Sequence, residues 1–293
     1  MEDKNMTALI SCFARAYHTK NYKFKIFNDP LAEKILSDEE YENISNNMKN
    51  GISFFNPNFK GTDEEALRFI VDNQLSPSVL GRSAFTERSL LNSKKLGAKQ
   101  YLIFASGYDT SFYKNNDLKV FEIDREEMIN DKKKRLSNAN IDYSNIEFIK
   151  ADFTNDDWIE LLLQSSYKRS EKAFCSLLGI SYYLTKEEFE NFISKISSVL
   201  QVGSEIVFDY PTFDETINEK LNQELAKAAN EEMKSKYSLS DLEKILEKNN
   251  MLIYENLTSD DMNREYFQDY NILNPKHQIK APKGVSYCLV VKR

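Results

Sequence analysis

A turn of small residues directly after an apolar run is the feature of this sequence that points most clearly to chemistry. The run covers residues 101–105, ends in Ala105, and is followed by Ser106 and Gly107. It predicts a strand whose carboxyl end opens into a turn with few side chains. Such a turn lets backbone N–H groups approach a bound small molecule, which is how open α/β sheets hold nucleotide-like cofactors. For a single glycine after a strand, an ordinary turn is the alternative reading.

Acids stand at the ends of the next two predicted strands. Glu122 and Asp124 lie at the end of a strand predicted near 118–123, and Asp152 follows one near 146–149. An acid at such a place can accept hydrogen bonds from both hydroxyls of a ribose. Alternatively, Glu122 and Asp124 are solvated loop acids, and Asp152 caps the helix that follows it. The order of the three strand ends favours a nucleoside-binding edge.

Length and composition indicate a globular protein with room for one large α/β domain and a helical extension. The chain has 293 residues, of which 41% are hydrophobic, and its apolar runs are far shorter than the roughly 18–20 residues that cross a bilayer. The amino terminus lacks a basic segment leading into a long apolar one, so we expect a cytoplasmic protein without a membrane partner. A net charge of −7 disfavours nucleic-acid binding. The basic run 132–135 is expected to form a solvated helix face.

The cysteines and histidines do not suggest a metal site. Three cysteines stand far apart, and each has an aromatic or aliphatic neighbour, so we expect buried free thiols. No pair of His or Cys residues has the spacing of metal ligands. The sequence also lacks a Gly-x-Ser-x-Gly elbow and a phosphate-binding Gly-Lys-Ser/Thr loop, which disfavours the commonest hydrolase and phosphotransferase chemistries.

Apolar periodicity divides the chain into a helical first part and an alternating second part. Residues 1–95 carry helical spacing and capping signals but no convincing strand, and we predict that they form a helical cap or lid. Residues 96–293 alternate strands with helices, which predicts an α/β domain with a parallel sheet. The last strand follows its predecessor with no clear helix between them, so we expect it to run antiparallel. Strands are predicted near 101–105, 118–123, 146–149, 173–178, 204–209, 251–255 and 286–291. Helices are predicted near 5–20, 29–36, 38–48, 63–75, 125–138, 155–165, 185–200, 213–233 and 238–249.

Several of these motifs together resemble a known family. The chain resembles the leucine carboxyl methyltransferase-like family of class I S-adenosylmethionine-dependent methyltransferases, a group that includes bacterial polyketide O-methyltransferases. The resemblance implies a Rossmann-like sheet of about seven strands, whose last strand is antiparallel, behind an amino-terminal helical cap. It rests on residues 14–17 and 28–32 in the cap, 81–87, the turn 105–110, 121–124, 151–153 with 157–158, and 179–184.

The resemblance also implies roles for individual residues toward S-adenosylmethionine. Arg82 matches the arginine that pairs with the methionyl carboxylate, a task suited to a guanidinium group. Asp124, with Glu122 beside it, would hold the ribose, and Asp152 would accept from the adenine amino group while the Phe153 backbone contacts the ring. The backbone of Ala105, Ser106 and Gly107 would pass close to the methionyl part.

Two departures from the family pattern concern this cofactor site. Ala105 stands where the family has the first glycine of its turn, which makes the loop stiffer. Leu178 stands before Gly179 where many members carry an acid, so a residue that contacts the methionyl amino group is missing. A cofactor-binding protein without turnover therefore stays open as an alternative.

The function predicted from these observations is O-methylation of a small molecule. A carboxylate acceptor is already anionic and needs no base, which agrees with the lack of a catalytic His or Cys cluster. A hydroxyl acceptor would need one, and His18, Tyr182 and Tyr183 are the candidates, with Tyr17 beside His18 in the cap. A less favoured alternative, an NAD-type oxidoreductase, lacks the three-glycine spacing expected for a pyrophosphate.

Overall fold

A seven-stranded sheet forms the centre of the molecule. The computed structural model describes residues 5–113, 117–152, 154, 157–214 and 232–293. The strand order is β3-β2-β1-β4-β5-β7-β6, with β1 to β5 parallel and β7 antiparallel to both of its neighbours. This confirms the predicted fold class and the direction of the last strand. The strands are β1 Gln100–Phe104, β2 Lys119–Asp124, β3 Ile146–Lys150, β4 Ala173–Leu177, β5 Glu205–Pro211, β6 Met251–Leu257 and β7 Val285–Lys292.

Helices cover both faces of the sheet because its central strands are apolar on both sides. Along β1, Tyr101 and Ile103 face one hydrophobic cluster, whereas Leu102 and Phe104 face another, as the two-residue period of a strand requires. The first cluster includes side chains of α1 (Met6–Asn21), α6 (Ser76–Lys95) and α7 (Glu126–Asn138). The second includes side chains of α8 (Trp158–Gln164), α9 (Lys186–Val199) and α11 (Leu239–Lys248).

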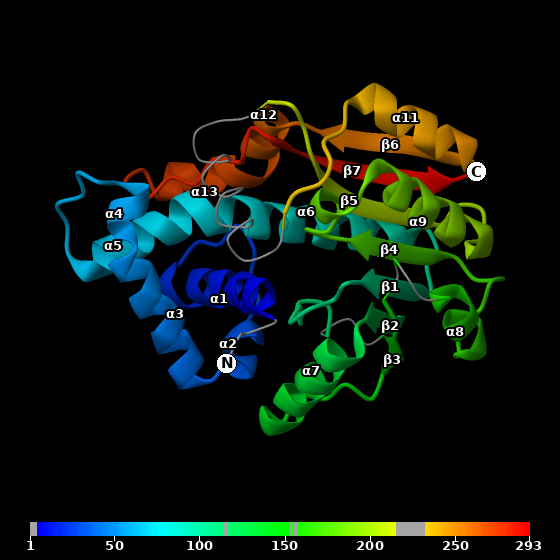
Figure 1. Cartoon of the computed structure of the whole chain (residues 1–293), viewed down its shortest axis with the longest axis horizontal. Coiled ribbons are helices and arrows are strands. Elements are labelled where there is room, and N and C mark those ends of the chain that lie inside the picture. The colour runs from blue at the N-terminus through cyan, green and yellow to red at the C-terminus, as the bar shows by residue number, and fades with distance from the viewer. Residues whose placement is uncertain (1–4, 114–116, 153, 155–156, 215–231) are drawn as a thin grey trace.

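The remaining amino-terminal helices gather at one end of the sheet. They are α2 Ala32–Ile35, α3 Asp38–Asn50, α4 Ile52–Phe55 and α5 Asp63–Ile70. Figure 1 shows them beside α1, at the end away from the C-terminus, while α6 runs from them across the sheet. Because the parallel strands end on this side, the helices lie over the carboxyl ends of the sheet. This is the edge at which open α/β sheets bind ligands.

Predicted capping signals set the starts of several helices. Ser37 accepts a hydrogen bond from the Glu40 backbone, and the Glu40 carboxylate accepts one from the Ser37 backbone. The same reciprocal pair links Thr62 with Glu65 at the start of α5. Each pair satisfies two backbone N–H groups that the first turn of a helix leaves without partners.

Three expectations about helices need correction or lie outside the described residues. The region between β6 and β7 is helical, in α12 (Ser259–Met262), a π-helical turn (Asn263–Phe267) and α13 (Gln268–Leu273). Met262, Phe267 and Tyr270 recur there at helical spacing and are buried. The sequence did not predict this helical segment because it has no long apolar stripe. The predicted helix 29–36 is reduced to α2. The predicted helix 213–233 falls mostly on residues 215–231, which lie outside the described part.

Two further short elements lie near the sheet edge and the cap. Ser181–Tyr183 forms a 3₁₀ turn after β4, and Val71–Leu75 forms a π-helical turn that joins α5 to α6 without a break. A π-helical turn inserts an extra residue into a helix and often marks a functional or strained position.

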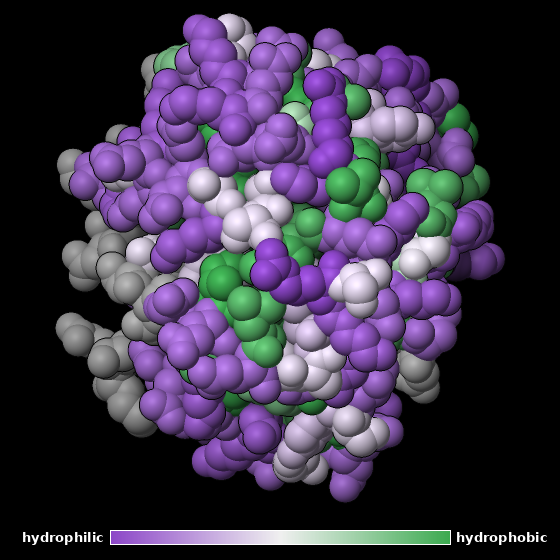
Figure 2. Space-filling model, turned by 90° about the vertical axis from the view of Figure 1, so that its right-hand side faces the viewer, coloured by the Kyte–Doolittle hydropathy of each residue, from purple (hydrophilic) through white to green (hydrophobic). Residues whose placement is uncertain are grey.

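The opposite end of the molecule, at the amino ends of the parallel strands, is mainly hydrophilic. Figure 2 shows this face, on which hydrophobic residues are set among hydrophilic ones. The loops at this end expose Leu96 and Val202, at 64% and 62% of their surface. Among the described residues, no helix is long and apolar enough to cross a membrane.

Candidate functional site

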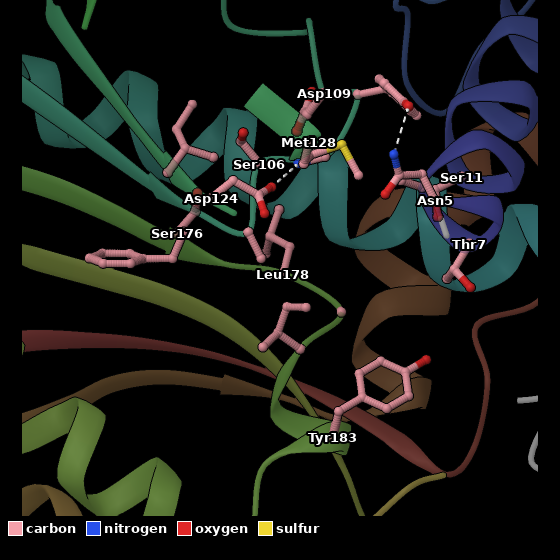
Figure 3. Close-up of a pocket in the computed structure, with 18 of the residues that line it drawn as sticks. Asn5, Thr7, Ser11, Ser106, Asp109, Asp124, Met128, Ser176, Leu178 and Tyr183 are labelled. Carbon is pink, nitrogen blue, oxygen red and sulfur yellow. Dashed lines mark hydrogen bonds between the residues drawn. The ribbon is translucent and has the colours of Figure 1, made fainter. Parts of the chain in front are cut away.

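A cavity of about 520 Å³ lies at the carboxyl ends of β1, β2 and β4. This volume is within the range of about 300–1,000 Å³ that small-molecule sites occupy. The sheet side of the cavity is lined by the turn 105–109, by Asp124 and by residues 178–180, and α1 and α6 supply the other side. Figure 3 shows Ser106, Asp124 and Leu178 on the sheet side and Ser11 across from them on α1.

The turn after β1 brings backbone groups into the cavity because two of its residues are left-handed. Ala105 has φ +50° and Gly107 has φ +46°. A Cβ atom on Gly107 would lie 3.3 Å from Cβ of Ala8, so glycine also allows α1 to approach the turn. Ala105 adopts a conformation that costs an L-residue about 1–2 kcal/mol. The alanine that stands in place of the family's glycine is thus held in a strained left-handed conformation.

Asp124 is the acid that the structure brings to this turn. It ends β2, is 7% exposed and lines the cavity. Its two carboxylate oxygens accept hydrogen bonds from the backbone of Gly107, at 2.9 Å, and of Arg125, at 2.8 Å. Burial raises the pKa of this carboxyl above its ordinary value, although both backbone donors and the nearby Lys132 charge favour the ionised form.

Arg82 reaches the cavity from α6. Its Nη2 donates to Oγ of Ser11 at 3.4 Å, and its Nη1 lies 3.8 Å from Oδ2 of Asp209. A Cβ atom on Gly179 would overlap Arg82 Nη1, so the guanidinium group lies directly against the glycine backbone. The structure therefore places Arg82, Ala105, Ser106, Gly107 and Asp124 around one cavity.

Glu122 does not line this cavity. Its carboxylate accepts hydrogen bonds from Lys132 Nζ at 2.6 Å and from the Tyr113 hydroxyl at 2.8 Å, and the side chains of the ion pair are fully buried. The expectation of a solvated helix face over 132–135 is therefore wrong for Lys132. Side chains two residues apart on a strand point to the same face of the sheet. Glu122 therefore lies on the same face as Asp124, but further from the carboxyl end of β2 and beneath α7.

The residues predicted to hold the adenine are placed only in part. Asp152 follows β3, and its Oδ1 accepts hydrogen bonds from the backbone and hydroxyl of Thr154, at 3.0 and 2.6 Å. It does not line the cavity. Phe153 lies outside the described residues. Contact of this segment with adenine stays a prediction.

Of the four residues predicted near the acceptor, only Tyr183 lines the cavity. Tyr182 is buried and donates to Oδ2 of Asp209 at 3.0 Å. Tyr17 and His18 are buried in the cap core. The Nε2 of His18 accepts a hydrogen bond from the backbone of Ile26, and burial lowers the pKa of its imidazole to about 3. A neutral, enclosed imidazole of this kind packs the cap and has no access to an acceptor.

Sequence reasoning missed Arg15 as a residue of the cavity wall. It is buried, and its Nε lies 3.0 Å from Oδ2 of Asp29 while its Nη2 donates to the Tyr108 carbonyl at 2.8 Å. The hydroxyl of Thr110 also donates to Asp29. Both Arg15 and Asp29 fall in motifs that suggested a family, but nothing in their spacing indicated that they meet. Together they fasten the cap to the turn after β1.

The sheet order and the cavity at the ends of β1 and β2 define the class I methyltransferase architecture. Residues 8–197 match the leucine carboxyl methyltransferase family, and the chain belongs to that family. Over 308 aligned positions it is 36% identical to a Bacillus subtilis protein named "Putative S-adenosyl-L-methionine-dependent methyltransferase YktD", with 99% of each chain covered.

A solved structure of a DUF574 family protein from Streptomyces avermitilis shares the fold. Its TM-score is 0.59 at 11% identity, with 97% of each chain covered. These findings confirm the predicted family and its cofactor, S-adenosylmethionine. The protein is an S-adenosylmethionine-dependent methyltransferase, which decides against the oxidoreductase alternative.

Proposed function

We propose that the protein transfers the methyl group of S-adenosylmethionine to a carboxylate oxygen of a small molecule. The observation that carries this proposal is the make-up of the cavity wall, whose described residues include no histidine or cysteine and, of the candidate bases named for a hydroxyl acceptor, only Tyr183. A hydroxyl acceptor needs a base to take its proton, whereas a carboxylate attacks as it is.

The described residues fit the cofactor that this reaction needs. Arg82 would hold the methionyl carboxylate, because a guanidinium group can donate two parallel hydrogen bonds to it. Asp124 would accept from the ribose hydroxyls, and the 105–107 backbone would lie along the methionyl part. When bound, the cofactor supplies an electrophilic methyl group on a sulfonium centre. The protein's task is then to align the acceptor oxygen with that methyl group and to exclude water.

The positive charge of Lys234, a residue that lines the cavity together with Tyr183, supports an anionic substrate. Lys234 donates a hydrogen bond from its backbone N–H to the Tyr182 carbonyl at 2.7 Å. Its Nζ is half exposed and lies 3.5 Å from the Glu188 carboxylate, a separation at which an exposed pair contributes little stability. The ammonium group can therefore turn to an incoming carboxylate at small cost.

The chemical stability of the product tests this proposal. The enzyme is incubated with S-adenosylmethionine labelled in its methyl group and with matched pairs of small carboxylic acids and the corresponding alcohols. We expect labelled product from the acids alone, and we expect mild alkali to release that label as methanol because it is held as an ester. Label that survives alkali as an ether would show a hydroxyl acceptor and would overturn the proposal.

Reversing the charge of Lys234 gives a second test. In Lys234→Glu we expect the KM for the carboxylate acceptor to rise by at least about tenfold, since like charges now meet, while the KM for S-adenosylmethionine stays within about twofold. Lys236→Glu makes the same change two residues away, outside the cavity wall, and serves as the matched control. Equal effects of the two variants would contradict a role for Lys234.

A further inference from the structure

Among the described residues, the part of the cavity wall that follows β4 and lies next to Arg82 contains no acid. Leu178 and Gly179, which follow β4, line the cavity at this point and contribute no charge. Within the described chain, the one ion pair that Arg82 makes is with Asp209, which stands on the neighbouring strand β5. The Asp209 carboxylate thus faces Arg82 from the protein interior, because Asp209 does not line the cavity.

Asp209 is fully buried and joins three parts of this wall. Its Oδ1 accepts a hydrogen bond from the Gly179 backbone at 2.6 Å, and its Oδ2 accepts one from the Tyr182 hydroxyl at 3.0 Å. The same Oδ2 lies 3.8 Å from Arg82 Nη1, and the Ser181 hydroxyl donates to the Asp209 carbonyl at 2.6 Å. A buried carboxylate is costly unless it is paired and hydrogen-bonded, and these contacts supply both conditions.

Gly179 lets the Arg82 guanidinium group lie against the backbone. Its φ of +69° is a left-handed conformation that suits glycine, and the space of its missing side chain is filled by the Arg82 guanidinium group. Ser11 accepts from the other side of that group. Asp209 therefore contacts both the Arg82 guanidinium group and the backbone against which that group lies.

We propose that Asp209 is a positioning residue for the amino-acid end of the cofactor. It acts through Arg82 and Gly179, since it does not line the cavity itself. Its negative charge keeps the guanidinium group seated against Gly179 and offsets part of the positive charge that the methionyl ammonium group would meet. This inference rests on the role proposed above for Arg82.

Two ligands that differ at one end separate this role from a general structural one. S-adenosylhomocysteine carries the amino-acid end, and 5′-methylthioadenosine lacks it. In Asp209→Asn the amide oxygen can still accept from Gly179 while the amide NH₂ donates to the Tyr182 hydroxyl oxygen, so the fold is retained but the charge is lost. By calorimetry we expect the Kd of S-adenosylhomocysteine to rise by at least about tenfold and that of 5′-methylthioadenosine to stay within about twofold.

Control variants decide between the possible outcomes. Asp142→Asn makes the same chemical change in an exposed loop and is expected to alter neither Kd. If Asp209→Asn fails to fold, Gly179→Ala moves the Arg82 guanidinium group away from the Asp209 carboxylate while Asp209 itself is kept, and the same selective loss is expected. Unchanged or tighter binding of S-adenosylhomocysteine by Asp209→Asn, or an equal loss for both ligands, would overturn the inference.

The role of Arg82 is tested separately with the same two ligands. Arg82→Lys keeps the charge but not the paired donors, so it should selectively weaken binding of S-adenosylhomocysteine. If this variant shows the selective loss and Asp209→Asn does not, Arg82 keeps its role and the inference about Asp209 fails. If Arg82→Lys binds both ligands as the parent protein does, the role of Arg82 itself fails.

Discussion

At the scale of single residues, Asp124 combines burial with the charge that its proposed contact with the ribose requires. Two backbone N–H groups hold its carboxylate at the edge of the cavity, yet burial raises its pKa above the ordinary value. The ionised form is the one that can accept from both ribose hydroxyls. Cofactor affinity should therefore depend on pH through this residue.

We predict that binding of S-adenosylhomocysteine weakens as the pH falls from 7 toward 5. Because burial raises the pKa of the Asp124 carboxyl, this acid takes up its proton at a higher pH than an ordinary aspartate does, and protonation removes the acceptor proposed for the ribose. Asp124→Asn should lose about 1–3 kcal/mol of binding free energy at pH 7, and its affinity should vary less with pH. Calorimetry between pH 5 and pH 8 measures both effects. Parallel pH profiles for the variant and the parent protein would assign the pH dependence to another group.

At the scale of elements, the π-helical turn Val71–Leu75 buries an acid between α5 and α6. The Tyr22 hydroxyl lies 2.7 Å from both oxygens of Asp72. Burial raises the pKa of Asp72 to about 6, and the hydrogen bond from Tyr22 and the charge of Arg68 lower it only in part. An acid that binds its proton more tightly in the folded state favours folding at low pH. This contribution is complete below the unfolded pKa near 4 and is lost as the pH rises through about 6.

We predict that Asp72→Asn stabilises the protein more at pH 7.5 than at pH 4. The amide is neutral at both values and its oxygen can still accept from Tyr22, so the variant avoids the cost of burying a charge at the higher pH. The difference in unfolding free energy between variant and parent should shift by about 1–3 kcal/mol over this range. Urea denaturation at both pH values measures it. Asp269→Asn, at an exposed position of α13, is the control and should show no such shift.

At the scale of the whole molecule, the helical cap and the sheet share one core. Phe13 of α1 and Leu80 of α6 belong to the same hydrophobic cluster as Tyr101 of β1. The buried pair of Arg15 and Asp29 joins the cap to the turn after β1. Removing the first 20 residues would expose this core, so we expect such a truncation to cost stability as well as catalysis.

We predict that Asp29→Ala lowers the unfolding free energy by about 3–5 kcal/mol, because it leaves the Arg15 charge buried without its partner. Because α1 supplies Ala8 and Ser11 to the cavity wall, we expect S-adenosylhomocysteine to protect α1 from hydrogen exchange in the parent protein, and we expect Asp29→Ala to lose this protection. Glu33→Ala breaks the exposed pair with Lys20 and should cost less than about 1 kcal/mol. Similar losses in the two variants would argue against a special role for the buried pair.

The strands and the turn after β1 could be predicted because their information is local. Short apolar runs between turn signals, such as residues 101–104 of β1 and 206–208 of β5, identify buried parallel strands, and a small residue after such a run predicts an open turn. Capping boxes likewise set the starts of α3 and α5 within a few residues. Arg82 and Asp124 could be matched to a family motif before their positions were known.

Which residues far apart in the sequence contact each other was decided by the tertiary structure alone. Glu122 and Asp124 are both acids on β2, but only the depth of each in the fold gives one a buried lysine and the other a cavity. His18 is chemically a candidate base until packing encloses it. Asp209 is an ordinary strand residue until the sheet order places β5 beside β4 and α6 carries Arg82 across both. Sequence patterns report the local preferences of the backbone, whereas burial and electrostatic pairing depend on which distant segments the sheet brings together.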